Sequence, residues 1–359
     1  MEEITHKMCP IKVGNLSGQP LVSVIVSNYN YCKYIEQAIR SVFDQTYCNL
    51  EVIVCDDGST DRSVEVLNGL VNIDARLKII IQKNQGQSKS INTGFSVSKG
   101  EIICLLDADD LFLPSKVQEV VDVFVQDEEN GACSHFLKVI DSDGRITGET
   151  IPSQLDEGFV GNKILKKGGN GYFAPTSGLS YRREVFECIT PLPDNLRISA
   201  DAYITQAAAF ITKIVCINNC LGCYRIHGRN NYQGTININN LRYLVEELVP
   251  STFIACRNFL SAFSGDEVAA HLKLDQSTYY LENIVIYCCL SGAKVDEVSP
   301  FSEKHVFSSL PYTARSKMLY LLYKSPRLIS STIARALLSN NFIRTVLGPL
   351  GKVLGFKKT

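Results

Sequence analysis

Acidic side chains stand where predicted strands of this sequence end. Asp107 and Asp109 follow the apolar run EIICLL and flank Ala108. Residues two apart at a strand end project to the same side, so both carboxylates can face one ion or one ligand. Clustered carboxylates repel each other unless a cation lies between them, and Mg²⁺ and Mn²⁺ prefer such hard oxygen ligands. The pair predicts a divalent-metal site; the alternative is that these residues, and Asp110 above all, only cap the next helix.

Two more polar clusters follow predicted strands. The first strand ends at SNYN, residues 27–30, and the second ends at DDGS, residues 56–59. Asp57 precedes Gly58, so by itself it could equally serve a tight turn or bind a ligand. In open parallel sheets the ligand lies outside the carboxyl ends of the strands. The three clusters are therefore expected to meet at one edge of a sheet.

The elements that would position these clusters alternate between strands and helices. Short β-branched apolar runs predict strands buried on both faces, and amphipathic spacing predicts the helices between them. The expected strands are 21–26, 51–55, 78–81 and 101–106, and the expected helices are 31–46, one opening near Thr60, and 87–98. This alternation favours an α/β fold with a mostly parallel, Rossmann-like sheet flanked by helices.

The second half of the chain is less regular. Pro114 suits the first turn of another helix, and Asp143-Gly144 between two strand-like runs predicts a hairpin turn rather than a calcium loop. A helix over 201–211 and a strand over 213–219 follow, and from about residue 240 the pattern is mostly helical. The expected organisation is an extension at 1–19, a catalytic domain at 20–235, and a helical C-terminal region at 236–359.

Composition and charge limit the class of protein. With 45% hydrophobic and 20% charged residues and a net charge of -1, the 359-residue chain is predicted to be globular and not to bind nucleic acid. No Asp or Glu follows Glu303, whereas ten Lys and Arg residues do. This basic, amphipathic tail could bind an anionic membrane surface or pack on the protein as a helical cap.

Cysteines and hydropathy bear on the location of the protein. Thirteen Cys residues occur, several of them within apolar runs, where a free thiol behaves as a small hydrophobic side chain. No signal peptide and no apolar run of about 18 residues are recognisable. We therefore expect a cytoplasmic protein, with peripheral attachment to the inner face of the membrane as an open alternative.

Several motifs in order resemble one enzyme family. The segments VSVIVSNYNYCKYIEQAIRSVFDQTY, EVIVCDDGSTDRS and NQGQSKSINTGFSVSKGEIICLLDADDLFLPSK together look like the family 2 glycosyltransferases, which have the GT-A fold. The match covers residues from about 21 to 120 and is highly specific. PTSGLSYRREVF and RISADAYITQAAAF continue it more thinly into the acceptor half.

The resemblance implies roles for individual residues. Ser27, Tyr29 and Asp57 would line the pocket of the nucleotide base, which is usually uracil. Asp107 would contact the ribose, and Asp109 would bind the Mn²⁺ or Mg²⁺ ion that bridges the diphosphate. These assignments come from the family and not from the spacing of the residues.

The acceptor half receives its roles in the same way. Asp201 would be the catalytic base, although it could also cap a helix over 202–211, and the two roles can coexist. His227, in the Tyr-Arg-x-His element, would approach the diphosphate or the metal, or else only anchor its loop. Arg225 of the same element is a weaker candidate.

The sequence also departs from the family pattern. Many relatives have Arg before the Asn of the NxG element, and this chain has Ile91 before Asn92. Lys89 could reach the phosphates instead, or it could be a solvated surface residue. A zinc site made of His227 and cysteines is a minor alternative, because no second Cys-x2-Cys pair completes it.

The resulting prediction is an inverting, metal-assisted glycosyltransferase. It would move a sugar from a nucleotide-sugar, expected to be UDP-linked, to a hydroxyl group of a glycan or lipid-linked acceptor in cell-surface polysaccharide or glycoconjugate synthesis. The alternative is a non-catalytic module that only binds a nucleotide-sugar, since folds outlive activities. The joint presence of Asp57, Asp107, Asp109 and Asp201 favours the enzyme.

Overall fold

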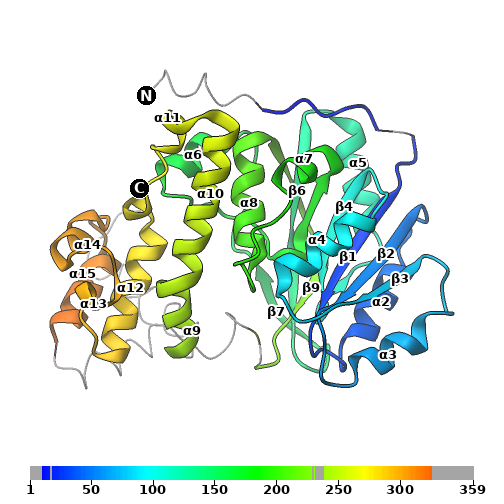
Figure 1. The fold of residues 1–359 in the computed structure, drawn as a ribbon, viewed down its shortest axis with the longest axis horizontal. Coiled ribbons are helices and arrows are strands. Elements are labelled where there is room, and N and C mark those ends of the chain that lie inside the picture. The colour runs from blue at the N-terminus through cyan, green and yellow to red at the C-terminus, as the bar shows by residue number, and fades with distance from the viewer. Residues whose placement is uncertain (1–9, 17, 229, 231–237, 326–359) are drawn as a thin grey trace. The chain divides into compact units, whose positions relative to one another are not determined.

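The structure is a computed structural model, and it describes residues 10–16, 18–228, 230 and 238–325 (Figure 1). The chain forms two compact units. The first comprises the chain up to residue 226 together with 251–272, and the second comprises 227–250 and the chain from 273 onward. Residues 251–272 thus group with the first unit, while the domain boundary near 235 stays a prediction.

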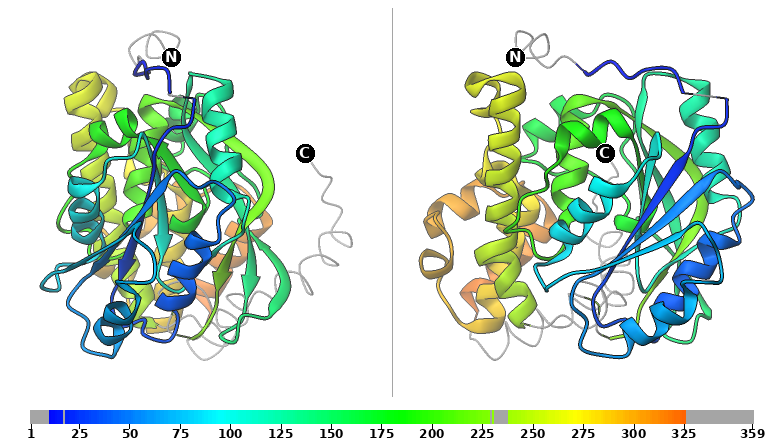
Figure 2. Two further views of the ribbon diagram at one scale, coloured as in Figure 1. Left: turned by 90° about the vertical axis from the view of Figure 1, so that its right-hand side faces the viewer. Right: turned by 45° about the vertical axis from the view of Figure 1, so that its right-hand side comes forward.

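The first unit is built around one β-sheet (Figures 1 and 2). Its strands are β1 (Val22–Asn28), β2 (Leu50–Asp56), β3 (Leu77–Ile81), β4 (Ile102–Asp107), β5 (Leu111–Phe112), β6 (Asn130–Ile140), β7 (Ile146–Ile151), β8 (Leu179–Arg182) and β9 (Lys213–Arg225). They are hydrogen-bonded in the order β3-β2-β1-β4-β8-β6-β9-β5, and β7 pairs with β6. The predicted α/β architecture is confirmed.

The half of the sheet that carries the predicted site is parallel. β1 pairs with β2 and β4, and β2 pairs with β3, in each case in parallel. Almost every residue of β1, β2 and β4 is buried, as expected for strands covered on both faces. The other half is mixed, because β8 runs antiparallel to β4 and β6, whereas β6 and β9 are parallel.

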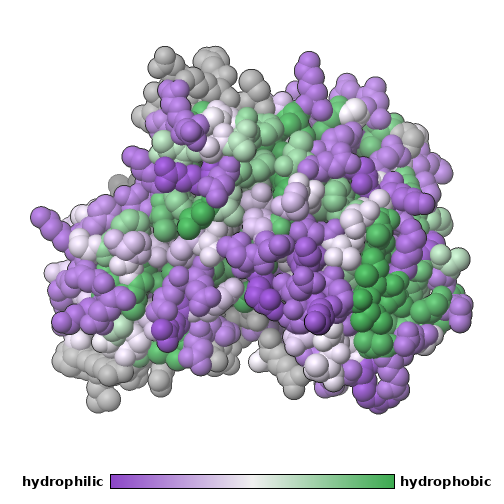
Figure 3. Space-filling view, in the orientation of Figure 1, coloured by the Kyte–Doolittle hydropathy of each residue, from purple (hydrophilic) through white to green (hydrophobic). Residues whose placement is uncertain are grey.

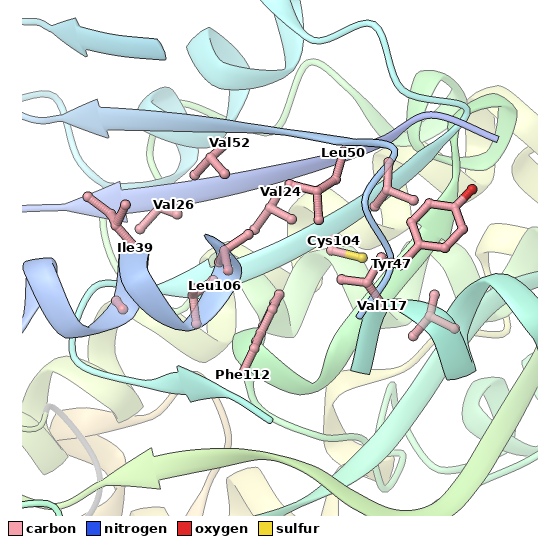
Figure 4. Packing of buried hydrophobic residues seen from close by; sticks show 14 of the residues in the cluster. Val24, Val26, Ile39, Tyr47, Leu50, Val52, Cys104, Leu106, Phe112 and Val117 are labelled. Carbon is pink, nitrogen blue, oxygen red and sulfur yellow. The ribbon is translucent and has the colours of Figure 1, made fainter. Parts of the chain in front are cut away.

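Helices cover both faces of the sheet. Those of the first unit are α2 (Ile35–Phe43), α3 (Ser63–Leu70), α4 (Gln87–Val97), α5 (Lys116–Gln126), α6 (Gly161–Lys166), α7 (Arg183–Ile189), α8 (Ala200–Ile211), most of α10 (Val249–Ser264) and α11 (Asp266–Ala269), with a 3-10 turn η1 at Thr176–Gly178. α2, α3 and α5 pack their apolar side chains on one face of β1, β2 and β4. Figure 4 shows Val24, Val26 and Leu106 of the strands beside Ile39 and Val117 of the helices. Burial of each such side chain contributes roughly 1.5–3 kcal/mol to folding.

The opposite face is covered by α4, which approaches the sheet closely. A Cβ atom at Gly94 would lie 2.6 Å from Cγ2 of Ile25 and 3.2 Å from Sγ of Cys55. Only glycine therefore fits at this point of the helix. α4 begins directly after the loop that follows β3, and its first residue, Gln87, reaches the site described below.

Two helix boundaries differ from the sequence-based prediction. The helix expected over 31–46 is confined to α2, because Asn30 has a left-handed backbone with φ of 61°. The amide groups of Tyr34 and Ile35 both donate to the carbonyl of Tyr31, which forms a tight turn before the helix. Pro114 precedes α5 and its N-cap, Ser115, instead of lying in the first turn of the helix.

The predicted hairpin is confirmed. β6 and β7 pair in an antiparallel manner around Gly144, whose φ is +87°. The carboxylate of Asp141 accepts the amide groups of Asp143 and Arg145, both at 2.9 Å, and this closes the turn. The turn is therefore stabilised by the side chain of Asp141.

The second unit is helical where it is described. It contains α9 (Ile238–Tyr243), a π-helical turn η2 (Leu244–Leu248), a 3-10 turn η3 (Leu274–Gln276), α12 (Thr278–Ser291), α13 (Val295–Val298), α14 (Glu303–Ser309) and α15 (Ala314–Lys324). α12 is buried on most sides, and side chains of the other helices pack around it. Residues 326–359, which make up most of the predicted basic tail, lie outside the described residues.

The hydropathy of the helices, the state of the cysteines and the exposed hydrophobic surface complete the description of the fold. No helix in the described part of the chain is both long and apolar enough to cross a membrane. The cysteines at described positions are all free thiols. The edge strand β3 leaves hydrophobic surface exposed, since Ile81 is 54% exposed, and hydrophobic residues (green) gather where β3 lies in Figure 3.

Candidate active site

The carboxyl ends of three parallel strands meet at one edge of the sheet. Asn28, the last residue of β1, lies opposite Asp56 of β2, and Ser27 lies opposite Asp107 of β4. The register therefore brings the three polar clusters to one level, as the sequence predicts. The residues of this site belong to the first unit, whereas the candidate residue His227 belongs to the second unit.

The end of β2 is held by Asp56, which is fully buried. Its carboxylate accepts the side-chain amide of Asn28 at 2.6 Å and the hydroxyl group of Ser59 at 2.7 Å. It also accepts the backbone amide of Ser59 at 2.9 Å. Asp56 therefore fixes the shape of the loop after β2, and this leaves its neighbour Asp57 to face the site.

Asp57 connects β2 to the loop that precedes α4. Its carboxylate accepts Nε2 of Gln82 at 2.8 Å and the backbone amide groups of Gln85 and Gly86 at 2.9 and 2.7 Å. A carboxylate has about four lone-pair sites, so three bonds leave capacity for one more donor. The structure places Asp57 where it organises the loop, and this role is compatible with a bond to a ligand.

The charges of two other carboxylates act on Asp107. Burial, followed by the negative charges of Asp109 and Asp201, raises its pKa to about 8. Its backbone amide donates to the hydroxyl group of Ser177 at 3.1 Å, and its Oδ1 atom accepts Nε2 of Gln87 at 3.0 Å. The charge of Asp201 thus acts on Asp107, although the two residues are far apart in the sequence.

The Asp-Ala-Asp motif alternates as the sequence predicts. Asp109 is 8% exposed, whereas Ala108 is buried in the hydrophobic core that α2 and α5 share with the sheet. Asp107 and Asp109 therefore lie on the same side, away from that core. Their carboxylates are close enough for the charge of Asp109 to raise the pKa of Asp107.

Asp110 does not cap a helix, so that alternative is wrong. It precedes β5, and α5 begins six residues later. Its carboxylate accepts the hydroxyl group of Ser177 at 2.6 Å and the backbone amide of Arg225 at 2.9 Å. Burial, followed by the charges of Asp109 and Asp107, raises its pKa well above the usual value. Asp110 thus ties the loop between β4 and β5 (residues 108–110, the acidic loop) to η1 and to the end of β9.

Arg225 supports the same loop from the other side. Its guanidinium group is buried, donates from Nε to the carbonyl oxygen of Asp109 at 2.8 Å, and donates to Oε1 of Gln37 at 2.9 Å. It also lies 4.7 Å from the centre of the Tyr34 ring, a cation–π contact. The structure thus gives Arg225 a role in positioning the acidic loop.

Asp201, the predicted base, lies in the first turn of α8 and is not its N-cap, so the alternative role as a helix cap is wrong. The helix begins at Ala200 and its N-cap is Ser199, which has a left-handed backbone with φ of 54°. One oxygen atom of Asp201 accepts the backbone amide of Ala202 at 3.0 Å. Burial raises the pKa of the Asp201 carboxyl group, which makes its carboxylate a stronger base than an exposed one.

Tyr31 and Tyr224 feel the charges of Asp107, Asp109 and Asp110, which we call the acidic cluster. The sequence alone did not identify either tyrosine as a site residue. Burial and the charges of Asp109 and Asp107 raise the pKa of Tyr31, and burial together with the charge of Asp110 and its neighbours raises that of Tyr224. Both phenol groups therefore stay protonated beside the carboxylates and can donate hydrogen bonds. Tyr224 is the Tyr of the Tyr-Arg-x-His element, whereas no motif distinguishes Tyr31.

The remaining predicted site residues are placed as follows. Ser27 is half-buried near the end of β1, and Tyr29, just beyond it, is 44% exposed. Lys89 lies on α4, and its ammonium group is 3.8 Å from the carboxylate of Asp194. His227 belongs to the second unit, where its backbone amide donates to Asn230 at 2.8 Å. These positions leave the predicted roles of the four residues as predictions.

The chemistry of the site fits a divalent cation that the substrate helps to bind. Among the residues that the structure describes, no group of three or more His, Cys, Asp or Glu side chains could hold a metal ion by itself, so the zinc alternative has no support. Asp107 and Asp109 offer carboxylate oxygens, and burial together with the charges of Asp109 and Asp201 raises the pKa of Asp107. Mg²⁺ and Mn²⁺ are typically bound by one or two carboxylates together with substrate phosphates.

Known proteins resemble this chain in the region of the site. Residues 23–190 match the family described as Glycosyl transferase family 2. An uncharacterized glycosyltransferase of Nostoc sp. is 42% identical over 215 residues, which are 59% of this chain and 66% of that protein. An uncharacterized glycosyltransferase of Haemophilus influenzae is 40% identical over 122 residues, which are 34% of this chain and 38% of that protein. The chain thus spans less than two thirds of the length of these two relatives.

A solved structure resembles the fold over most of its length. The S. aureus protein TarS 1-349, crystallised in complex with UDP-GlcNAc, has a TM-score of 0.51 and 15% sequence identity to this chain. The comparison covers 89% of this chain and 91% of that one. At this identity the likeness concerns the fold, and it agrees with the architecture expected from the sequence.

Proposed function

We infer that this chain, a family 2 glycosyltransferase with the GT-A fold, transfers one sugar from a nucleotide-sugar to an acceptor hydroxyl group with inversion at the anomeric carbon. One observation carries the proposal. The carboxylates of Asp107, Asp109 and Asp201 come from β4, the loop after it and α8, and the charges of Asp109 and Asp201 both act on Asp107. An inverting transfer needs this combination of a donor-side pair and a separate base.

The donor would lie across the ends of β1, β2 and β4. Asp57 has capacity for one more hydrogen-bond donor, and Ser27 and Tyr29 lie at the end of the neighbouring strand, so a nucleotide base could bind there. Asp107 would then contact the ribose, and Lys89 could approach the phosphates. We propose UDP as the nucleotide, and UDP-GlcNAc, with which TarS was crystallised, is a first compound to test.

The metal would be Mn²⁺ or Mg²⁺, held by Asp109 with Asp107 beside it and with His227 as a further candidate ligand. When bound, such an ion supplies Lewis-acid stabilisation to the departing nucleoside diphosphate. The protein contributes the position of these carboxylates, because Arg225 and Ser177 hold the backbone on either side of them. Tyr31 and Tyr224 add phenol donors at the border of the cluster.

Asp201 would act as the base. Its carboxylate takes the proton of the acceptor hydroxyl group while that oxygen attacks the anomeric carbon, and the bond from that carbon to the phosphate oxygen breaks. A positioned base contributes about 100- to 10,000-fold to such a step. The raised pKa of Asp201 suits this role, since a carboxylate in water is a weak base.

The acceptor, the cellular location and the membrane attachment of the protein are further proposals. We propose a glycan or lipid-linked acceptor, in the synthesis of a cell-surface polysaccharide or glycoconjugate. We further propose a cytoplasmic protein whose basic C-terminal segment can attach it to an anionic membrane surface. Binding of the whole protein to vesicles that contain anionic lipid, and its release by salt, would test the last point.

The experiment that tests the reaction compares three variants with the parent protein. With Mn²⁺ and a panel of nucleotide-sugars, we expect the parent to release nucleoside diphosphate. Asp201→Asn should lose about 100-fold or more in kcat and keep donor binding, whereas Asp109→Asn should weaken the binding of donor and metal. Asp143→Asn removes an exposed carboxylate on the hairpin turn and serves as the control.

Two outcomes would contradict the proposal. If Asp109→Asn and Asp201→Asn both transfer sugar at the rate of the parent, the assigned roles are wrong. If the parent is stabilised against heat by a nucleotide-sugar but releases no nucleoside diphosphate with any donor and acceptor, the chain is the non-catalytic binding module.

A further inference from the structure

The loop before α4 contacts the segment that leads into α8, although the two are far apart in the sequence. Gly86 has φ of +97°, and a Cβ atom there would lie 2.6 Å from Cα of Arg197. The backbone amide of Gln87 donates to the carbonyl oxygen of Arg197 at 2.8 Å. The guanidinium group of Arg197 donates in turn to the side chain of Asn84. The two segments are therefore joined by backbone contacts, which define their spacing closely.

The side chain of Gln87 makes one hydrogen bond to Asp107 and another to the first residue of α8. Nε2 donates to Oδ1 of Asp107 at 3.0 Å, and Oε1 accepts the backbone amide of Ala200 at 3.0 Å. The backbone amide of Ala200 can only donate, so it requires Oε1 of Gln87 as its acceptor and leaves Nε2 to face Asp107. Ala200 is the first residue of α8 and precedes Asp201 directly.

We propose that Gln87 is a positioning residue of the transfer reaction, because one amide group links the carboxylate that faces the donor to the helix that carries the base. This role rests on the proposed function. Gln87 itself touches neither reacting atom; it sets the separation between Asp107 and Asp201. A base must lie within hydrogen-bond reach of the acceptor hydroxyl group, and a displacement of 1 Å can lower the rate up to about 100-fold.

Two substitutions separate the two bonds. Gln87→Met has a similar length and makes neither bond. Gln87→Glu keeps an oxygen atom that can accept the amide of Ala200, but it removes the donor to Asp107 and places another negative charge there. Gln118→Met is the matched control, since Gln118 on α5 donates from Nε2 to Asp122 at 2.8 Å without any contact to the site.

The first measurement is backbone hydrogen exchange in the full chain. We expect Gln87→Met to exchange faster than the parent in peptides that contain Ala200, because the amide loses its acceptor. Gln87→Glu should exchange like the parent there, and so should Gln118→Met. This measurement needs no substrate, so it tests the link between the loop and α8 even if the proposed reaction is wrong.

The second measurement is steady-state transfer with a UDP-sugar and Mn²⁺. We expect Gln87→Met to lower kcat about 10- to 100-fold, and Gln87→Glu to raise KM for the donor several-fold with a smaller loss of kcat. A residue that only stabilised the fold would lower the melting temperature and the amount of active protein, but it would not divide its effects between kcat and KM in this way. Binding of UDP with Mn²⁺, measured by calorimetry, should weaken for Gln87→Glu in the same proportion as KM rises.

The outcomes are distinguishable. Parent-like exchange around Ala200 in Gln87→Met would overturn the link, and parent-like kcat and KM in both Gln87 variants would overturn the positioning role. A parent protein that shows the expected exchange pattern but transfers no sugar would instead contradict the proposed function. If Gln87→Met does not fold, Gln87→Glu still decides, through the rise in donor KM with unchanged exchange at Ala200.

Discussion

The guanidinium group of Arg225 donates to the carbonyl oxygen of Asp109 at 2.8 Å, so the last residue of β9 holds the backbone of the acidic loop. The backbone amide of Arg225 also donates to the carboxylate of Asp110 at 2.9 Å. β9 is thus joined to the loop between β4 and β5 through the main chain of Asp109 and the side chain of Asp110. The positions of Asp107 and Asp109 depend on a residue more than a hundred positions away in the sequence.

Replacement of Arg225 should therefore destabilise the protein. Arg225→Met keeps most of the volume but removes the donor to the buried carbonyl oxygen of Asp109 and the donor to Gln37, which is exposed. We expect a loss of about 2–3 kcal/mol in the free energy of unfolding, measured by urea denaturation. Arg145→Met removes an exposed guanidinium group from the hairpin turn and should change the free energy by about 0.5 kcal/mol or less. Equal urea midpoints for parent and Arg225→Met would refute the supporting role.

The close contact at Gly86 leads to a second prediction. Gly86→Ala places a methyl group 2.6 Å from Cα of Arg197, so the backbone on one side must move. Gly148 on β7 also has a positive φ, of +87°, but a Cβ atom there would meet nothing within 4 Å. We expect Gly148→Ala to cost roughly 1 kcal/mol, and Gly86→Ala to cost clearly more and to slow the reaction. Equal losses of unfolding free energy in the two variants would show that the backbone at Arg197 moves aside without an additional cost.

Asn92 gives a third prediction. Its side-chain amide donates to the carbonyl oxygen of Leu192 at 2.9 Å and accepts the backbone amide of the same residue at 2.8 Å. Asn92→Asp would set a carboxylate oxygen against that carbonyl oxygen, at a cost of about 1–3 kcal/mol. In the matched control, Asn283→Asp, the amide that donates to Tyr279 at 2.7 Å is exposed, so water can replace it. The melting temperature of Asn92→Asp should therefore lie several degrees below that of Asn283→Asp.

The strands that carry the site could be predicted because their signals are local. The runs that form β1, β2 and β4 are short, apolar and followed by polar clusters, and their side chains need no distant partner to be recognised. Parallel pairing then brings the ends of these strands together. The place of Asp57, Asp107 and Asp109 in the fold follows from that pattern.

The partners of the acidic residues could not be predicted in this way. Asp110 and Asp201 both look like helix caps in the sequence, because a cap is the commonest local role of an Asp before a helix. In the structure, Asp110 binds Ser177, which is 67 residues away, and Arg225, which is 115 residues away. Gln87 likewise binds Ala200 across 113 residues. Such contacts depend on the packing of β8, β9 and α8 and have no signature in a single sequence.

The buried imidazole of His135 gives a prediction about pH. His135 is fully buried on β6, its Nδ1 donates to the carbonyl oxygen of Phe136 at 2.9 Å, and its Nε2 is among the buried atoms without a partner in the described part of the chain. Burial, and then the positive charge of Lys116, lowers its pKa to about 3. The folded protein thus holds this ring neutral under conditions in which the unfolded chain protonates it.

The direction of the pH effect follows from these two pKa values. Above about pH 6.5 the imidazole is neutral in both states, whereas between pH 6.5 and 3 only the unfolded chain binds the proton, so stability falls as the pH falls. At pH 5 the group should cost about 2 kcal/mol relative to pH 7. His135→Leu removes this dependence on pH. From pH 7 to pH 5 the parent should therefore lose about 2 kcal/mol more unfolding free energy than the variant. His271→Leu replaces an exposed imidazole, and its unfolding free energy should change with pH as that of the parent does. If the unfolding free energies of His135→Leu and the parent change in parallel with pH, His135 is not the source of the acid sensitivity.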